Sequence, residues 1–445
     1  MTKARKRYVG LDVHKDVVEY CILDSEGRKL DGGNFICEQS VIVNFAKNVL
    51  SPKDHVALET TANTWTVVDI LEPFVEKIVV GNPLKTKIIA EAKVKTDKVD
   101  AMILAQLLRC NFLPDVWVPD KQTRERRRIS SFRKSLVQNV TATKNRIKGI
   151  LNHLLIKHEV SWTKQGLEEL KKLNLPPVER TIMNSEIASL EHLKLQIANI
   201  EAEIQKLAFA DDNIRILMTL PGFNYNAATA VLAVLGDISR FKDADHVASY
   251  LGLVPRVKQS ANSCHYGSIT KTGSALARTM LCEAAQCLLK HDGPLGVFAR
   301  RILAKKGWNK AVIAGARKLA TIAYRMLKNN EPYRYAVAAR TQDKLRNLRN
   351  KAGGAKLPPP PRYRYDAEVQ KNRPKGDFQV RYVPPLADVY KNEGLPLALT
   401  FSELSSGEQR VLKEMGMAEK IQANEKVGII TRAKKSTSPT KQSGK

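Results

Sequence analysis

The first 115 residues combine short apolar runs of strand type with a helical repeat. Strand-like runs rich in β-branched and aromatic residues lie at Tyr8–Val13, Val17–Leu23, Gly33–Cys37, Val56–Glu59 and Lys77–Val80. Residues 41–50 instead repeat apolar positions with helical spacing. The first two runs are separated by a short turn, so we expect them to pair antiparallel. The pattern predicts a mixed sheet with helices on its faces.

From about residue 119 the apolar spacing becomes helical. Ser131–Leu155 and Ile187–Leu207 carry apolar residues every three or four positions, which predicts two long helices folded back as a coiled-coil hairpin. The fold class is therefore α/β followed by all-α parts. We expect four parts: residues 1–118, the mixed-sheet domain; 119–210, a basic helix and coiled-coil stalk; 211–335, a mostly helical domain with a Gly/Ser-rich loop; and 336–445, a linker and a basic, partly disordered extension. Within the extension, Ser405 followed by Glu408 predicts the start of a small helix.

Charge points to the kind of partner. The 445 residues include 73 Lys and Arg against 45 Asp and Glu, a net charge of +28, which favours a polyanion and nucleic acid ahead of a membrane surface. No apolar run approaches the roughly 18–20 residues of a membrane span, and the first residues lack a signal peptide's apolar region. We expect a cytoplasmic, nucleoid-associated protein. Six scattered cysteines without a CxxC pair indicate that any metal is held by oxygen.

Four acids form the main candidate for chemistry. Asp12 lies inside the first strand-like run, Glu59 closes another, and Asp97 and Asp100 are three residues apart on one predicted helical face. An acid within an apolar run costs free energy unless it is paired or metal-bound. Convergence of the four would suit Mg²⁺ or Mn²⁺, hard ions that prefer oxygen and stabilise attacking and leaving oxygens at phosphorus.

Each acid also has an ordinary structural interpretation. Acids at strand ends and in the first turn of a helix are common caps. His14 follows Asp12 closely and could be a metal ligand, but we interpret it as a lone surface histidine.

A basic stretch at residues 121–148 is the candidate nucleic-acid contact. It has ten basic side chains and one acid, Glu125. The basic residues are Lys121, Arg124, Arg126, Arg127, Arg128, Arg133, Lys134, Lys144, Arg146 and Lys148. Such a face binds phosphates without reading sequence. A solvated coiled-coil face is the alternative.

Residues 214–235 resemble a helix-hairpin-helix. Pro221 and Gly222 turn the chain, and the helix that follows could hold a phosphate on its N-terminal amides. Asn224 stands near the place of the usual second glycine, so a plain helical turn is equally consistent.

Ser260 is the candidate nucleophile. It lies in a stretch rich in glycine and serine, and Lys258, Lys271 and Arg278 could stabilise developing charge at phosphorus. His265 could serve as a base, although we consider it incidental. The alternative is an ordinary Ser-rich loop.

Several motifs share one order along the chain. They are GLDVHK, ALETT, KTDKVDA, LPGF, GLVPRVKQSA, GSITKTG with Arg278, and ARKLATIAYRML at 316–327. Together they resemble the DEDD-type transposases of the IS-one-ten insertion-sequence family, the bridge-RNA-guided recombinases. The resemblance runs from about residue 7 to 335.

The resemblance implies a ribonuclease H-like (RuvC-like) first domain whose metal-binding tetrad is Asp12, Glu59, Asp97 and Asp100. It also implies that Ser260 attacks DNA and becomes covalently linked to it, and Ala261 follows where the family usually has glycine. The implied partners are double-stranded donor and target DNA, a guide RNA, and further copies in a dimer or tetramer, because one subunit's acids complete another's serine site.

Two other functions remain open. A metal-dependent junction nuclease would use the carboxylates and activated water, without Ser260. A nucleic-acid-binding protein with a degenerate site would need neither Asp12 nor Ser260.

Overall fold

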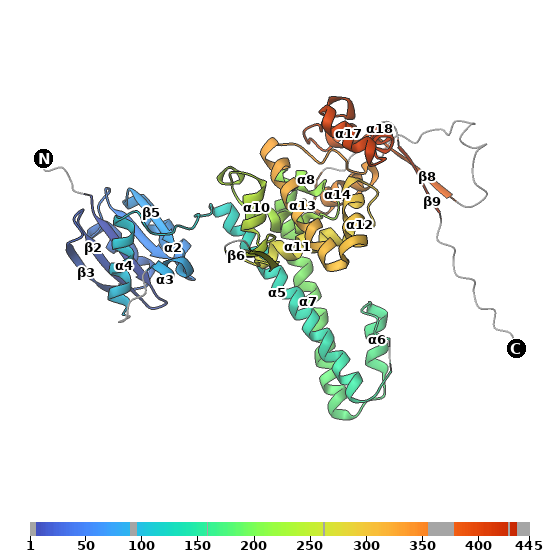
Figure 1. Ribbon diagram of the computed structural model, residues 1–445. Helices are drawn as coiled ribbons and strands as arrows, with labels where there is room; N and C mark the ends of the chain where they lie inside the picture. Colours follow the sequence, from blue (N-terminus) through green and yellow to red (C-terminus); the bar gives the residue numbers. More distant parts are fainter. Residues whose placement is uncertain are drawn as a thin grey trace. The chain divides into compact units, whose positions relative to one another are not determined.

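Five strands form one mixed sheet in the first unit of the computed structural model (Figure 1), which describes residues 6–89, 96–157, 159–260, 263–354, 378–425 and 428–433. They are β1 (Tyr8–Val13), β2 (Val17–Leu23), β3 (Lys29–Ile36), β4 (His55–Glu59) and β5 (Lys77–Gly81). Their order is β3-β2-β1-β4-β5, with β1–β2 and β2–β3 antiparallel and β1–β4 and β4–β5 parallel. The predicted mixed sheet is confirmed and is consistent with a ribonuclease H-like fold. β3 begins before the expected Gly33, because an edge strand can carry the polar Asp31 on an exposed side.

Helices cover both faces of this sheet. α1 (Gln39–Asn48) and α2 (Thr64–Leu71) share one core with alternate β1 residues such as Leu11, and α4 (Asp97–Arg109) packs on the opposite face. η1 (Glu72–Phe74) and α3 (Pro83–Ile89) complete the unit. Because side chains alternate along a strand, Gly10 and Asp12 lie on the α4 side of β1.

The second unit, which begins at Lys121, opens with two long helices packed side by side (Figure 1). They are α5 (Lys121–His153) and α7 (Pro177–Ala210), joined through α6 (Lys164–Lys172). Ion pairs Arg126–Asp211, Arg133–Glu201 and Arg146–Glu186 step in opposite directions along the two helices, so the pair is antiparallel. Both helices were predicted. Each begins about ten residues earlier than predicted, in sequence that is more polar.

The rest of the unit is a helical core. Its helices are α8 (Asp212–Met218), α9 (Tyr225–Leu235), η2 (Ile238–Arg240), α10 (Ala244–Tyr250), α11 (Ala275–Leu288), α12 (Pro294–Lys306), α13 (Trp308–Asn329), α14 (Ala338–Lys351) and α16 (Leu386–Asn392). α9 is central, with every residue from Asn226 to Leu235 buried. α14 and α16 contribute Leu345, Leu348 and the fully buried Tyr390 to the same core. The core therefore continues past the boundary expected at residue 335.

Three short helices follow: η3 (Phe401–Glu403), α17 (Ser406–Glu414) and α18 (Ala418–Glu425). Their apolar side chains form a small cluster of their own around Leu412, against Val297 and Tyr335. The Ser405 hydroxyl accepts a hydrogen bond from the Glu408 amide at 3.3 Å, so the predicted helix start is confirmed. The strands β8 (Phe378–Val383) and β9 (Gly428–Ala433) pair antiparallel.

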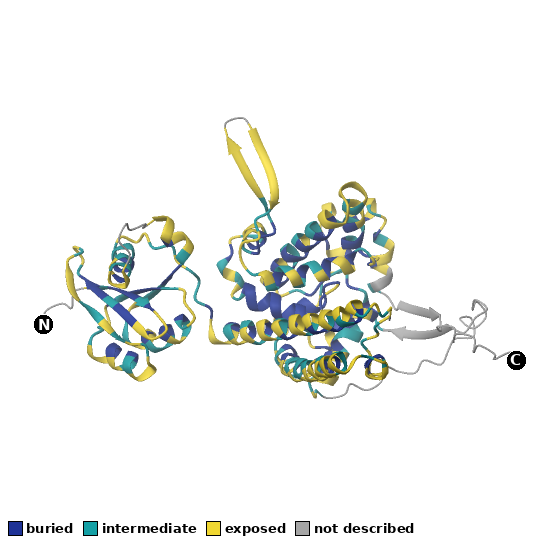
Figure 2. Ribbon diagram, turned by 90° about the horizontal axis from the view of Figure 1, so that it is seen from below, coloured by how far each residue is buried: buried dark blue, intermediate teal, exposed yellow. Residues whose placement is uncertain are grey.

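A two-stranded hairpin projects from the helical core and is exposed on both faces (Figure 2). It consists of β6 (Pro255–Ser260) and β7 (Ser263–Ile269), paired antiparallel. It occupies most of the stretch expected to be a Gly/Ser-rich loop. In the described ranges, no helix is both long and apolar enough to cross a membrane.

Candidate metal centre and serine hairpin

Three of the candidate side chains meet just beyond the end of β1. His14 Nε2 lies 3.1 Å from Asp12 Oδ2 and 3.4 Å from Asp97 Oδ1. One ligand atom from each of the three residues lies within 4.8 Å of the others. This is a carboxylate and histidine cluster of a size that could surround one ion.

Gly10 allows α4 to approach the sheet closely enough to form this cluster. A Cβ atom at Gly10 would lie 1.9 Å from the Ala101 carbonyl oxygen and 2.7 Å from the Ala105 amide nitrogen. Only glycine fits between the strand and the helix backbone there. The first turn of α4, which carries Asp97 and Asp100, is consequently held beside Asp12.

Glu59 reaches the same edge through strand pairing. β1 and β4 are parallel with Leu11 opposite Leu58, so the next residues, Asp12 and Glu59, are neighbours about 4.8 Å apart across the two strands. Ala57, two residues before Glu59, packs on α4, which places the Glu59 side chain on that face too. The fold thus brings Asp12, Glu59 and the first turn of α4 to one edge.

The electrostatics of the cluster favour a bound cation. Burial raises the pKa of Asp12 and the charges of Asp100 and Asp97 raise it further, whereas His14 opposes them. The Asp12 charge, with a smaller contribution from Asp97, raises the pKa of His14. Crowded carboxylates of this kind are stabilised by a positive charge. Their oxygen atoms suit a hard divalent ion.

His14 is exposed, as expected, but it is not a lone histidine, because it contacts both Asp12 and Asp97. Its amide donates to the Val17 carbonyl at 2.9 Å, closing the turn between β1 and β2, and this turn directs the ring toward Asp12. A histidine immediately after a strand that ends in an acid, at the start of a tight turn, is the signal that could have identified it.

Ser260 is the last residue of β6 and lies exposed near the tip of the hairpin. It is paired with Ser263, whose hydroxyl donates to the Ser260 carbonyl at 3.2 Å. Ala261 lies outside the described residues. Ser260 belongs to the second unit of the chain and the acid cluster to the first.

The three cations predicted around Ser260 differ in their surroundings. Lys258 is exposed on β6, and Lys271 is exposed just after β7 in a left-handed conformation. Arg278 instead donates to the carbonyls of Leu251, Thr272 and Gly273, with the shortest contact 2.6 Å. Arg278 therefore holds the base of the hairpin.

At least half of the predicted phosphate contacts on α5 are engaged within the protein. Arg126, Arg133 and Arg146 pair with acids of α7 or its C-cap. Arg127 donates to the Ala233 carbonyl at 2.7 Å, and the Lys144 ammonium lies 5.1 Å from the Trp162 ring centre. These five side chains stabilise the helix packing. Sequence reasoning missed this because their partners are distant in the chain.

The other five basic side chains of α5 differ in their exposure. Lys121, Arg128 and Lys148 are exposed, whereas Arg124 and Lys134 are half-buried. The exposed three keep their charge available for a phosphate backbone.

The turn between α8 and α9 is a plain helical turn, without a phosphate site. The Asn224 side chain caps α9 by accepting from the Ala227 amide at 2.9 Å. Tyr225 and Asn226 both donate to the Glu201 carboxylate beside it. Asn224 therefore already occupies an amide that a phosphate would need. Gly222 is required because a Cβ would lie 2.5 Å from the Ala284 carbonyl oxygen.

Comparison with known families identifies the chain. Residues 9–156 match a family model described as a transposase, of the DEDD type, and residues 214–297 match the transposase IS116/IS110/IS902 family. The chain belongs to this family of transposases. The first match contains all four candidate acids, and the second contains Ser260 and the whole hairpin.

Relatives of this transposase have similar names. The transposase for insertion sequence element IS1111A of Coxiella burnetii is 25% identical over 348 residues, covering 74% of this chain and 91% of the relative. The pilin gene-inverting protein of Moraxella lacunata is 25% identical over 342 residues, covering 74% and 98%. The family therefore consists of enzymes that act on DNA.

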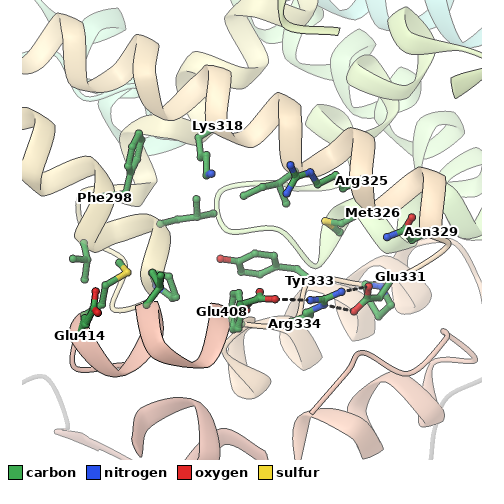
Figure 3. Close-up of a pocket in the computed structure, with 18 of the residues that line it drawn as sticks. Phe298, Lys318, Arg325, Met326, Asn329, Glu331, Tyr333, Arg334, Glu408 and Glu414 are labelled. Carbon is green, nitrogen blue, oxygen red and sulfur yellow. Dashed lines mark hydrogen bonds and ion pairs between the residues drawn. The ribbon is translucent and has the colours of Figure 1, made fainter. Parts of the chain in front are cut away.

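The transposase also has a cavity of about 750 Å³ between α12, α13 and α17 (Figure 3). Arg334 crosses its edge, pairing with Glu331 at 2.5 Å and with Glu408 at 3.2 Å. None of the residues predicted from the sequence to act in catalysis or nucleic-acid binding lines this cavity.

Proposed function

We propose that this transposase cuts and rejoins DNA through a covalent intermediate on Ser260, with help from a metal ion at the acid cluster. The observation that carries the proposal is the meeting of Asp12, His14 and Asp97 at the edge shared with Glu59. The family match supports the same assignment, because each of its two parts contains one half of the chemistry.

The covalent step is a transesterification. A bond forms between the Ser260 hydroxyl oxygen and phosphorus, and the bond from phosphorus to one sugar oxygen breaks. The serine proton leaves to a nearby base or to solvent, and the departing sugar oxygen takes up a proton. Rejoining is the reverse reaction with a different sugar hydroxyl, so the bond energy is conserved and no external energy source is needed.

Asp12, Glu59, Asp97 and Asp100 would hold the ion, with His14 as a further ligand. Carboxylate oxygens select Mg²⁺ or Mn²⁺. When bound, such an ion stabilises negative charge on the phosphate oxygens. The close packing at Gly10 keeps the ligands positioned for this task.

The two halves of the site lie in different units of the chain, and this supports assembly of several copies. We propose a dimer or tetramer in which the acids of one copy act with Ser260 of another, and in which the α5–α7 stalk forms a coiled-coil contact. The exposed cations of α5 would bind the phosphate backbone of donor DNA, target DNA or a guide RNA.

The test is an adduct assay on the full chain with the RNA that copurifies with it. Protein, Mg²⁺ and end-labelled DNA carrying the junctions that flank the chain's own gene are incubated, denatured and separated by size. The intact protein should give a covalent protein–DNA species. Ser260→Ala and Asp12→Asn should each abolish it, whereas Ser263→Ala, the matched change on the opposite strand, should retain it.

Other outcomes would assign the protein differently. Cleaved free ends without any adduct, unchanged in Ser260→Ala, would indicate a metal-dependent junction nuclease. DNA binding that is unaffected by either substitution, with no cleavage, would indicate a nucleic-acid-binding protein with a degenerate site.

A further inference from the structure

The β6–β7 hairpin has two chemically different faces. Residues directly opposite in an antiparallel pair share a face, and faces alternate along each strand. Lys258 is opposite His265, and Ser260 is opposite Ser263. These four residues form what we call the serine face. Arg256 lies beside it at a register shift, where its Cβ is 3.7 Å from the position that a Cβ at Gly267 would take.

The other face has no charged side chain and carries the hairpin's one aromatic ring. Val257 is opposite Tyr266, and Gln259 is opposite Cys264. We call these four residues the tyrosine face. Val257 is 52% exposed and Tyr266 is 73% exposed, although a tyrosine ring normally buries much of its surface. Tyr266 pairs with Val257 through the strand ladder, and its hydroxyl makes no hydrogen bond with any other described residue.

The charge of the segment around the hairpin indicates the kind of partner that the hairpin binds. Between Asp245 and Glu283 the sequence contains no acid, while Arg256, Lys258, Lys271 and Arg278 all lie there. An acid-free cationic ribbon with one exposed aromatic ring matches single-stranded nucleic acid, which combines backbone phosphates with stacking bases.

We propose that the hairpin enters the DNA at the cleavage site, with the serine face on the phosphates and Tyr266 stacked on an unpaired base. This inference rests on the proposed function of Ser260. Tyr266 is level with Val257, three residues from Ser260, or about 10 Å along a strand. Tyr266 is thus a positioning residue that keeps the strand open beside Ser260.

The test measures binding and needs no knowledge of the target sequence. A fluorescein-labelled 20-base-pair duplex and the same duplex with two central mismatched, unpaired positions serve as probes for the full chain. We expect the intact protein to prefer the mismatched duplex. Tyr266→Ala should reduce this preference about ten-fold, and Tyr266→Phe, which keeps the ring, should retain it.

A second variant separates stacking from charge. Lys258→Gln should lower the slope of log affinity against log salt by about one unit while leaving the preference for the mismatched duplex unchanged. Tyr266→Ala should do the opposite. Both quantities are measured by binding alone, without cleavage, so a failed adduct assay and a failed stacking assay can be told apart.

Two results would overturn the inference. One is a preference for the mismatched duplex that survives Tyr266→Ala. The other is equal binding of both duplexes by the intact protein; weaker self-association of Tyr266→Ala in sedimentation velocity would then make the tyrosine face a contact between copies of this chain.

Discussion

Replacement of Gly10 by alanine tests whether helix packing positions the acid cluster. The new Cβ would lie 1.9 Å from the Ala101 carbonyl oxygen, whereas ordinary contact begins at 3.4 Å, so α4 must move by about 1.5 Å. Overpacking of this kind costs about 1–3 kcal/mol of stability. A displacement near 1 Å at a reacting centre lowers a rate about 100-fold. Asp97 and Asp100 move with the helix, so we expect weaker metal binding and at least this loss of adduct formation.

Mn²⁺ titration followed by electron paramagnetic resonance measures the metal affinity, and urea unfolding measures the stability of the same sample. Gly33→Ala is the matched control, because its Cβ would lie 3.4 Å from the nearest atom of the Tyr20 ring, an ordinary contact. The control should keep its metal affinity. If Gly10→Ala bound Mn²⁺ and formed the adduct as the intact protein does, the packing of α4 would not position the acids.

Three further predictions concern the second unit. Burial lowers the pKa of His291 from 6.5 to about 4, so between these pH values the unfolded chain binds more protons than the folded chain. Urea unfolding at several pH values should therefore show the free energy of unfolding falling as the pH drops from 6.5 to 4. His291→Gln should make this dependence on pH weaker. Arg128→Gln should lower the slope of log DNA affinity against log salt concentration by about 0.9. Arg126→Gln should leave that slope unchanged. It should lower the free energy of unfolding by about 3–5 kcal/mol, because it breaks a nearly buried ion pair. Tyr390→Phe removes a buried 2.7 Å hydrogen bond to a backbone carbonyl, and thermal or urea unfolding should show a loss of about 1–3 kcal/mol with DNA binding intact.

The sheet could be predicted because its strands have strong local signals. β1 and β2 have the bounds that the apolar runs indicated, and β4 and β5 differ from theirs by one residue at one end. The limits of the helical core could not be predicted in the same way. The Gly353 and Pro358–Pro361 region resembles a linker, yet Tyr390 beyond it is fully buried in the core. The packing of Tyr390 in this core joins positions far apart in sequence, so the local pattern of residues cannot predict it.

In the site too, features set by neighbouring residues could be predicted, and features set by residues distant in sequence could not. The placement of Asp97 and Asp100 on one helical face could be predicted, because their three-residue spacing is visible in the sequence. The role of Arg126 does not, because its partner Asp211 is 85 residues away and only the folded α5–α7 pair joins them. A count of cations along one helix overestimates the charge available to DNA whenever a second helix supplies the acids.

The acid cluster and the hairpin have opposite chemical deficiencies. Carboxylates gathered around Asp12 repel a phosphate unless a cation lies between them, so this edge alone cannot bind DNA well. The hairpin has cations and a hydroxyl but no acid from residue 246 to residue 282, so Ser260 has no carboxylate base nearby in its own segment. A serine hydroxyl is a weak nucleophile without a base or a metal ion. Each half therefore supplies what the other lacks, which is a chemical reason for the proposal that both act on the same phosphodiester.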